Sequence, residues 1–132
     1  MELTNMSGGV TRIADLPYGR YARLQVVNDG IDWLVSLFNA KNQCVTQMKF
    51  LNVVSIRYGD LEHLQGVAGE SYESLVRINN SPWVKEVLAR RHPDKFYFPV
   101  AHFTFLASDY GYFEFLCENT ELEIDPLVEN HA

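Results

Sequence analysis

Two residues near the C-terminal end of the chain could transfer a proton between them, His102 and Glu118. Alternating apolar residues predict an antiparallel hairpin there, which would place the imidazole opposite the carboxylate, within reach for general acid–base work. The same pair is also common as a plain surface ion pair, and no third group is positioned to complete a site. Glu114 shares this face, but it lies ~13 Å along the strand from Glu118, too far for one metal ion to bridge both. We therefore expect no metal here.

Candidate nucleophiles are few. Cys44 and Cys117 are the two cysteines, far apart and each within an apolar, strand-like pattern, which predicts isolated thiols rather than a disulfide or a metal pair. Cys117 belongs to the inward face of the predicted hairpin, whereas Cys44 follows a polar loop and could be exposed. The chain holds no GxSxG elbow, no GxGxxG and no phosphate loop. These observations predict a protein that is not an enzyme and uses no cofactor.

The hairpin itself is the best-defined element. We predict strands at Ala101–Ala107 and Tyr112–Glu118 around a three-residue loop, Asp109 to Gly111, with Phe105 opposite Phe115. This register gathers Phe103, Phe105, Phe113, Phe115 and Cys117 on an inner face. The outer face would carry His102, Thr104, Leu106, Glu114 and Glu118. A slip by one residue would exchange the two faces, so the alternation favours this pairing.

Period-two alternation and turn residues predict the remaining strands, and one segment predicts a helix. Ser81 can cap the first turn, Pro82 fits the first helical position, and Trp83 would anchor the helix on the sheet; the helix would end before His92-Pro93. The fold class is therefore α+β: a single antiparallel sheet of six or seven strands, a meander plus the C-terminal hairpin, with one helix at Pro82–Arg91 packed on it. The other predicted strands are Tyr21–Val27, Ile31–Phe38, Cys44–Leu51, Val53–Tyr58 (a fourth strand, or a continuation of the third past a bulge near Asn52) and Tyr72–Ile78.

Length and composition are typical of one globular domain. The chain has 132 residues, 47% of them apolar and 13% aromatic, which suffices for a core without disulfides. No apolar run approaches the ~20 residues of a membrane-spanning helix, and the N-terminus lacks a secretion signal, so we expect a cytoplasmic protein that does not bind membranes. We expect a single domain over 1–132, with flexible ends at 1–16 and 126–132.

Charge is distributed unevenly. The formal net charge is −6, but residues 1–59 carry +2 and residues 60–132 carry −8. Such a field repels nucleic acid and attracts basic partners, although acidic ends also serve solubility alone. The aromatic segment Phe96–Phe98 is either a loop that closes over the core or an anchor at an interface. The residues predicted to bind a partner are Asp109, Glu114, Glu118, Glu121, Glu123, Asp125 and Tyr97.

Several segments resemble a group of small, uncharacterised bacterial α+β proteins. VTQMKFLNVVSIRYG at 45–59 is similar to their V-x-L-x-F-x-N-V strand, and YESLVRINNS at 72–81, followed by Trp83, is similar to their strand leading into Asn-Ser and a helix. Ala101-His102-Phe103 and the segment 113–117 match their last hairpin. The likeness covers about two-thirds of the chain, leaves out 61–71, and consists of strand and cap residues that indicate a fold more than a function.

Small acidic α+β proteins of this appearance are frequent among the immunity proteins that neutralise bacterial toxins. The resemblance therefore implies a protein-binding module, an immunity-type inhibitor of a basic toxin domain, and it assigns no functional residues. On this hypothesis Glu114, Glu118, Glu121, Glu123 and Asp125 should share one exposed surface. Two alternatives remain: a small enzyme or ligand-binding domain that uses the sheet face around His102, Thr104 and Glu114, and a homodimer joined through edge strands or Phe96–Phe98.

Overall fold

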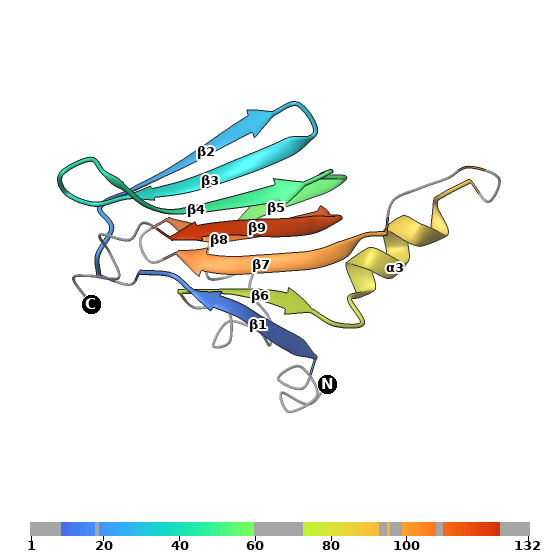
Figure 1. Ribbon diagram of the computed structural model, residues 1–132. Coiled ribbons are helices and arrows are strands. Elements are labelled where there is room, and N and C mark those ends of the chain that lie inside the picture. The colour runs from blue at the N-terminus through green and yellow to red at the C-terminus, as the bar shows by residue number, and fades with distance from the viewer. Residues whose placement is uncertain are drawn as a thin grey trace.

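The chain forms two antiparallel β-sheets and one short helix in a computed structural model, which describes residues 9–17, 19–59, 73–92, 95, 99–107 and 110–124 (Figure 1). The expected α+β chain dominated by antiparallel strands is confirmed. The expectation of a single sheet is wrong, because the described strands divide into two sheets that enclose one core.

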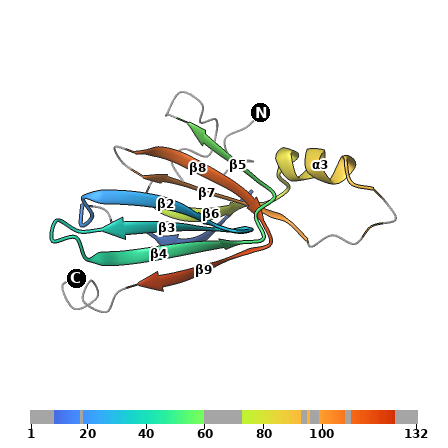
Figure 2. The same ribbon diagram turned by 90° about the horizontal axis from the view of Figure 1, so that it is seen from above.

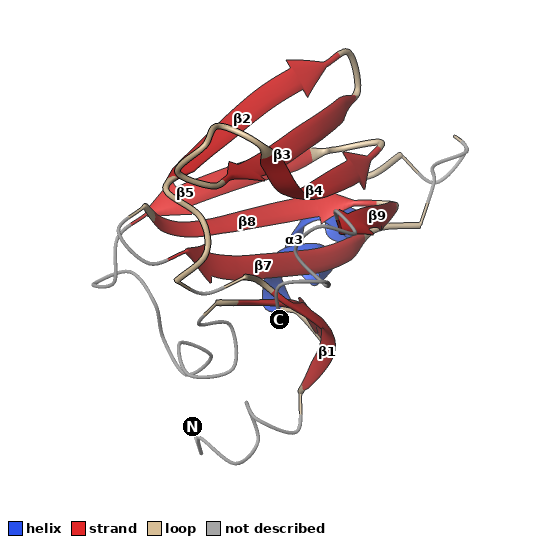
Figure 3. Ribbon diagram, turned by 60° about the vertical axis from the view of Figure 1, so that its left-hand side comes forward, coloured by secondary structure: helices blue, strands red, loops and turns tan. Residues whose placement is uncertain are grey.

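Among the described residues, five strands form one sheet and four form the other (Figures 1 and 3). The seven pairings between these strands are all antiparallel. The five-stranded sheet has the order β1 (Val10–Asp15), β6 (Ser74–Ile78), β7 (Ala101–Ala107), β8 (Gly111–Cys117) and β5 (Ser55–Gly59). The four-stranded sheet has the order β2 (Arg23–Asp29), β3 (Asp32–Phe38), β4 (Cys44–Leu51) and β9 (Asn119–Ile124).

A bent ladder connects the two sheets. β4 continues into β5, and β8 continues into β9, so the two long segments remain paired while they pass from one sheet to the other. The bend occurs at Asn52, whose φ of 54° lies in the left-handed region, and across the ladder at Glu118, whose N–H donates to the carbonyl of Leu51 (2.8 Å). Of the two alternatives for Val53–Tyr58, a separate fourth strand is the one that forms, as β5 in the other sheet. An extra or irregular residue bends and twists a strand. One pair of long antiparallel segments can therefore belong to one sheet before the bend and to the other sheet after it.

Two strands lie outside the sequence-based predictions. β1 pairs with β6 within the stretch 1–16, for which the sequence predicts no strand. β9 pairs with β4 in an acidic stretch for which the sequence predicts no strand. Both have few apolar positions: those of β1 are Val10, Ile13 and Ala14, which do not follow a period of two, and those of β9 are Leu122 and Ile124, so each leaves a weak signal in the sequence. The stretch 126–132 lies outside the described residues.

The core lies between the two sheets, and Phe50 of β4 is at its centre. Its ring stacks on Phe115 with centroids 3.9 Å apart, and it approaches Phe105 at 6.3 Å and Phe103 at 6.5 Å. The inner face predicted for the hairpin is therefore confirmed as core. The buried cluster comprises Leu16, Val35, Leu37, Val45, Met48, Phe50, Leu75, Phe103, Phe105, Ala107, Phe115 and Cys117.

The hairpin of β7 and β8 has a different register from the predicted one. Phe105 faces Phe113 rather than Phe115, and His102 faces Leu116 rather than Glu118. The pairing is displaced by two residues, and a displacement of two leaves every side chain on its predicted face. Alternation can exclude a slip of one residue but is blind to a slip of two, because the side-chain period is two.

The helix α3 (Pro82–Ala89) begins where the sequence predicts it. The Ser81 side chain accepts the N–H of Val84 (3.3 Å), and Pro82 occupies the first helical position. The helix lies at one end of the two sheets instead of across a sheet face, and none of its own residues is buried (Figure 2). The sequence predicts a helix that packs on the sheet along its length, whereas the observed helix contacts the sheet only through its first turn. No helix in the described parts of the chain is long and apolar enough to cross a membrane.

Gly111 opens β8 with φ of 98°, and a Cβ atom there would lie 2.6 Å from the carbonyl oxygen of Gly59 in the neighbouring strand. Gly111→Ala should lower the free energy of unfolding by about 2–4 kcal/mol, because it adds a backbone clash to left-handed strain. Gly30→Ala is the matched control: its φ is 68° with open space around it, and it should cost about 1–2 kcal/mol. Urea denaturation of both variants measures the difference, and equal losses would contradict the close approach of β5 to β8.

Candidate functional site

A chain of hydrogen bonds runs from the start of α3 across the outer face of the five-stranded sheet. Ser81 Oγ lies 2.7 Å from His102 Nδ1, and His102 Nε2 lies 2.7 Å from Glu114 Oε1. All three residues are buried, with exposed fractions of 3%, 4% and 8%. A carboxylate can only accept, so Nε2–H of His102 donates to Glu114; in the neutral ring Nδ1 then accepts the Ser81 hydroxyl, a tautomer inferred from the partners.

Arg57 and Trp83 complete the group, which we call the His102 cluster: Arg57, Ser81, Trp83, His102 and Glu114. Arg57 Nε lies 3.2 Å from Glu114 Oε2, and its guanidinium carbon lies 3.7 Å above the Trp83 ring. The Trp83 ring meets the His102 ring edge-on, with centroids 5.2 Å apart. The indole therefore contacts both partners of Glu114, the Arg57 guanidinium and the His102 imidazole.

Four different elements supply the His102 cluster. Arg57 comes from β5, His102 from β7 and Glu114 from β8, while Ser81 and Trp83 come from the first turn of α3. Glu114 faces Arg57 directly in the β5–β8 ladder. It reaches His102 diagonally, because the residue opposite Glu114 in β7 is Thr104. The observed register thus changes the partner of His102 from the predicted Glu118 to Glu114.

The environment of Glu114 favours its ionised form. Burial alone would raise the pKa of this carboxyl, but the hydrogen bond and charge of His102, together with Arg57, outweigh burial and hold the pKa below the ordinary value of 4.5. A carboxylate with two positive or donating partners is well suited to remain charged in a buried position. Glu114 is therefore the anionic centre on which the cluster converges.

The order hydroxyl, imidazole, carboxylate is the order that activates a serine nucleophile in hydrolases. Here the Ser81 oxygen also accepts the N–H of Val84 as the helix cap, and only 3% of the residue is exposed. A nucleophile needs a free approach for a carbonyl carbon, and this hydroxyl is committed to its cap and to the ring. The geometry is that of a buried network that fastens the first turn of α3 to β7 and β8.

A second buried carboxylate, Glu73, lies just before β6 with an exposed fraction of 6%. The Tyr21 hydroxyl donates to it, with distances of 2.7 and 3.0 Å to its two oxygens. Its backbone N–H donates to Leu106 and its carbonyl accepts from Leu16. This residue ties the chain before β2 to the five-stranded sheet. Among the described residues, no group of three or more His, Cys, Asp or Glu could hold a metal ion.

The predicted acidic surface does not form as one surface. Glu114 is buried in the His102 cluster, so its expected exposure is wrong; the reason is that it pairs with His102 and Arg57. Glu118 is half-buried at the bend, where Asn52 donates to it. Glu121 and Glu123 are exposed on β9, in the other sheet. Asp109, Asp125 and Tyr97, with the rest of Phe96–Phe98, lie outside the described residues.

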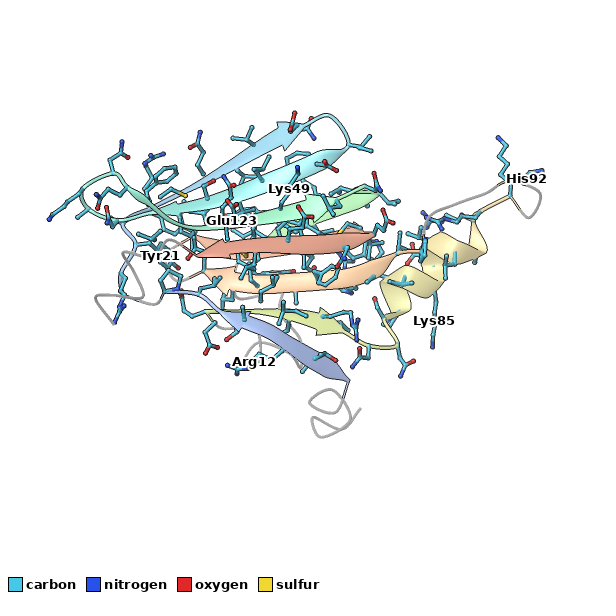
Figure 4. All side chains as sticks on the ribbon, viewed as in Figure 1. Arg12, Tyr21, Lys49, Lys85, His92 and Glu123 are labelled. Carbon is cyan, nitrogen blue, oxygen red and sulfur yellow. The ribbon has the colours of Figure 1, made fainter. Side chains whose placement is uncertain are left out.

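Glu121 and Glu123 belong to the outer face of the four-stranded sheet. Leu122 between them packs on the core, so the two carboxylates point away from it. In the register, Glu121 faces Lys49 and Glu123 faces Gln47. Figure 4 shows the side chains of Lys49 and Glu123 on this sheet. The same face continues across β3 and β2 through Ser36, Leu34, Gln25 and Val27.

Both cysteines are free thiols, as the sequence predicts. Burial raises the pKa of Cys117 to about 12, and its sulfur lies 3.5 Å from the carbonyl oxygen of Asn119. A thiol that stays protonated at neutral pH is a poor nucleophile and a poor metal ligand. Cys44 is half-buried at the start of β4.

Sequence reasoning found His102 and Glu114 but missed Arg57 and the second role of Ser81. Ser81 is recognisable as a helix cap from its local sequence, whereas its bond to His102 spans 21 positions and has no local signal. In the sequence, nothing distinguishes Arg57 from an ordinary exposed residue of a strand. Only the pairing of β5 with β8 places it beside Glu114.

Glu114→Gln tests the charge of the cluster. The pKa of Glu114 is lower in the folded state than in the unfolded chain, so its ionisation stabilises the fold above pH ~4.5, and this stabilisation is lost as the pH falls through the folded-state pKa. The variant should unfold about 1–3 kcal/mol more easily at pH 7, and its difference from wild type should narrow as the pH falls below ~4.5. Denaturation at a series of pH values measures this. A difference that stays constant with pH would show that the ionisation of Glu114 does not couple to folding.

Comparisons with known proteins provide no relative from which to transfer a role. No protein-family model matches this chain, no curated protein matches it, and no solved structure matches it. The roles of these residues are therefore inferred from their own geometry.

Proposed function

We propose that this chain is a protein-binding module, an immunity-type inhibitor whose contact surface is the outer face of the four-stranded sheet. The observation that carries the proposal is the pair of exposed carboxylates, Glu121 and Glu123, side by side on the edge strand β9. They lie in the part of the chain that carries a net charge of −8. Exposed carboxylates at an open sheet face favour a basic partner and speed its approach.

The composition of this face suits recognition of a protein. Val27 of β2 is 44% exposed and lies in one cross-strand row with Leu34, Lys49 and Glu121. The neighbouring row holds Gln25, Ser36, Gln47 and Glu123, and Gln47 donates to Ser36 (3.2 Å). The face thus carries apolar residues towards β2 and charged residues towards β9, and protein interfaces commonly combine both kinds of residue. The resemblance to small acidic α+β proteins supports the inhibitor reading.

A second candidate function is a hydrolase or ligand-binding domain at the His102 cluster. One observation favours it: hydroxyl, imidazole and carboxylate are joined by two contacts of 2.7 Å. The buried hydroxyl and its engagement in the helix cap support a structural role for the cluster instead. Binding through the four-stranded sheet is therefore the proposal that we favour.

Reversing the charges of β9 tests the proposed contact. Immobilised wild-type chain should capture a basic partner from a lysate of its native host, and the purified partner should then associate at least about tenfold more slowly with Glu121→Lys/Glu123→Lys at low salt, because attraction becomes repulsion. Asp15→Lys/Glu86→Lys is the control, since it makes the same change of net charge at two exposed carboxylates elsewhere. If both double variants slow association equally, the effect comes from net charge alone and not from the position of the carboxylates. If the β9 variant associates at the wild-type rate, this contact surface is ruled out.

Ser81→Ala separates the two candidate functions. We expect the substitution to lower the free energy of unfolding by about 1–3 kcal/mol, because it removes a helix cap and a buried hydrogen bond. A fluorophosphonate probe, which labels activated serines, should leave the folded wild-type chain unmodified at Ser81. Labelling that disappears in Ser81→Ala and in His102→Ala would instead establish a serine nucleophile, provided that it persists in the control Ser55→Ala, which replaces a serine of β5 and leaves Ser81 and His102 in place.

A further inference from the structure

The four-stranded sheet ends on one side at β2, a regular strand whose outer edge pairs with no described strand. Its seven residues pair with β3 without interruption, and five of the seven are exposed. The strand contains no proline, glycine or lysine and no bulge, the devices that commonly protect an edge from another strand. Successive backbone groups point to alternate edges, so part of the N–H and C=O groups of β2 face outward and are available for pairing.

The charges of β2 are arranged for pairing with an identical strand. Arg23 begins the strand and Asp29 ends it, six positions apart, so both side chains lie on the same outer face. In an antiparallel pair of identical strands with Val26 facing Val26, Arg23 of each copy faces Asp29 of the other. Gln25 then faces Val27, and the two ion pairs lie symmetrically on either side of the centre. A strand that complements itself in this way is what a two-fold dimer requires.

Other registers lose this match. Residues directly opposite each other in an antiparallel pair point to the same side of the sheet. In a pair of identical strands, the two-fold axis must therefore pass through a residue and cannot pass between two residues. With the axis at Gln25, Arg23 would face Val27; with the axis at Val27, it would face Ile31. Only the axis at Val26 brings both charges of each copy opposite a charge of the other sign.

Arg23 is held in position for such a contact, and Asp29 is exposed to it. The Arg23 guanidinium lies 3.9 Å above the Phe38 ring and donates to Asn42 Oδ1 (2.6 Å), which limits its motion at the start of the strand. Asp29 is exposed at the other end, and no ion pair joins it to any residue in the described part of the chain. The preordered cation lowers the entropy that association would cost, and the carboxylate has no ion pair within the described residues to lose.

The other edges in the described sheets fit a second copy less well. β1 has a register shift between Arg12 and Ala14. β5 has five residues with Arg57 at its centre, where a two-fold pairing would place the two guanidinium groups opposite each other. β9 would bring Glu121 and Glu123 of one copy against the same carboxylates of the other. The edge of β2 is thus favoured over these three edges by both regularity and charge.

We propose that two copies of this chain associate through antiparallel pairing of β2 with β2 about Val26, which joins two four-stranded sheets into one continuous sheet. The proposal does not depend on the proposed inhibitor function, since the carboxylates of β9 lie at the opposite edge of each sheet. The dimer leaves both outer faces on the same side and doubles the surface offered to a partner.

Sedimentation equilibrium of the full chain tests the pairing. The mass should rise with protein concentration from 15.2 kDa towards twice that value. Arg23→Asp and Asp29→Arg should each weaken the dimer about tenfold or more, because each substitution replaces two attractions by two repulsions. The double variant Arg23→Asp/Asp29→Arg exchanges the charges and should restore the wild-type dimer. Lys41→Glu in the exposed turn after β3 is the control and should change nothing.

Hydrogen exchange gives a second readout that needs no variant. Amides of residues 23–29 should exchange more slowly as the wild-type concentration rises, while those of β9 should not respond. A monomer at every concentration would overturn the proposal. The β2 pairing and its register would be overturned if neither single variant weakened the dimer. They would also be overturned if the double variant Arg23→Asp/Asp29→Arg failed to restore it.

Discussion

The stacking of Phe50 on Phe115 is the contact on which the rest of the structure depends. It joins β4 of one sheet to β8 of the other at 3.9 Å, and both rings are almost completely buried. Two antiparallel sheets have little stability unless each covers the apolar face of the other, and burial of large aromatic side chains supplies most of that stabilisation. Because Phe50, Phe103, Phe105 and Phe115 all turn inward, the opposite side of β7 and β8 is left to carry the polar residues of the His102 cluster.

The bend of the β4–β5 and β8–β9 ladder decides which residues meet on that opposite side. By carrying β5 into the sheet of β8, the bend places Arg57 beside Glu114. The same bend carries β9 into the other sheet, which separates Glu121 and Glu123 from Glu114. A chain of carboxylates close together in sequence is thus divided between a buried network and an open face. The buried member contributes to stability, and the exposed members remain available to a partner.

The sequence alone predicted most of the elements and the faces of the strands. β4 and β7 have the predicted bounds, and the first turn of α3 begins at Ser81 as its cap predicts. These features depend on neighbours within a few positions, such as period-two alternation, turn residues and helix caps. The strands β1 and β9 were not predicted because β1 has no regular alternation and β9 has only two apolar residues, Leu122 and Ile124.

What only the tertiary structure decided is the pairing between strands. Alternation excluded a slip of one residue in the hairpin but could not distinguish the predicted pairing from one displaced by two, and that displacement replaced Glu118 by Glu114 as the partner of His102. The division into two sheets, and with it the position of Arg57, depends on a bend at one left-handed residue, Asn52. The sequence thus determined which side chains face inward, because that property is local. The packing of the two sheets determined which polar side chains meet, because those contacts join residues far apart in the chain.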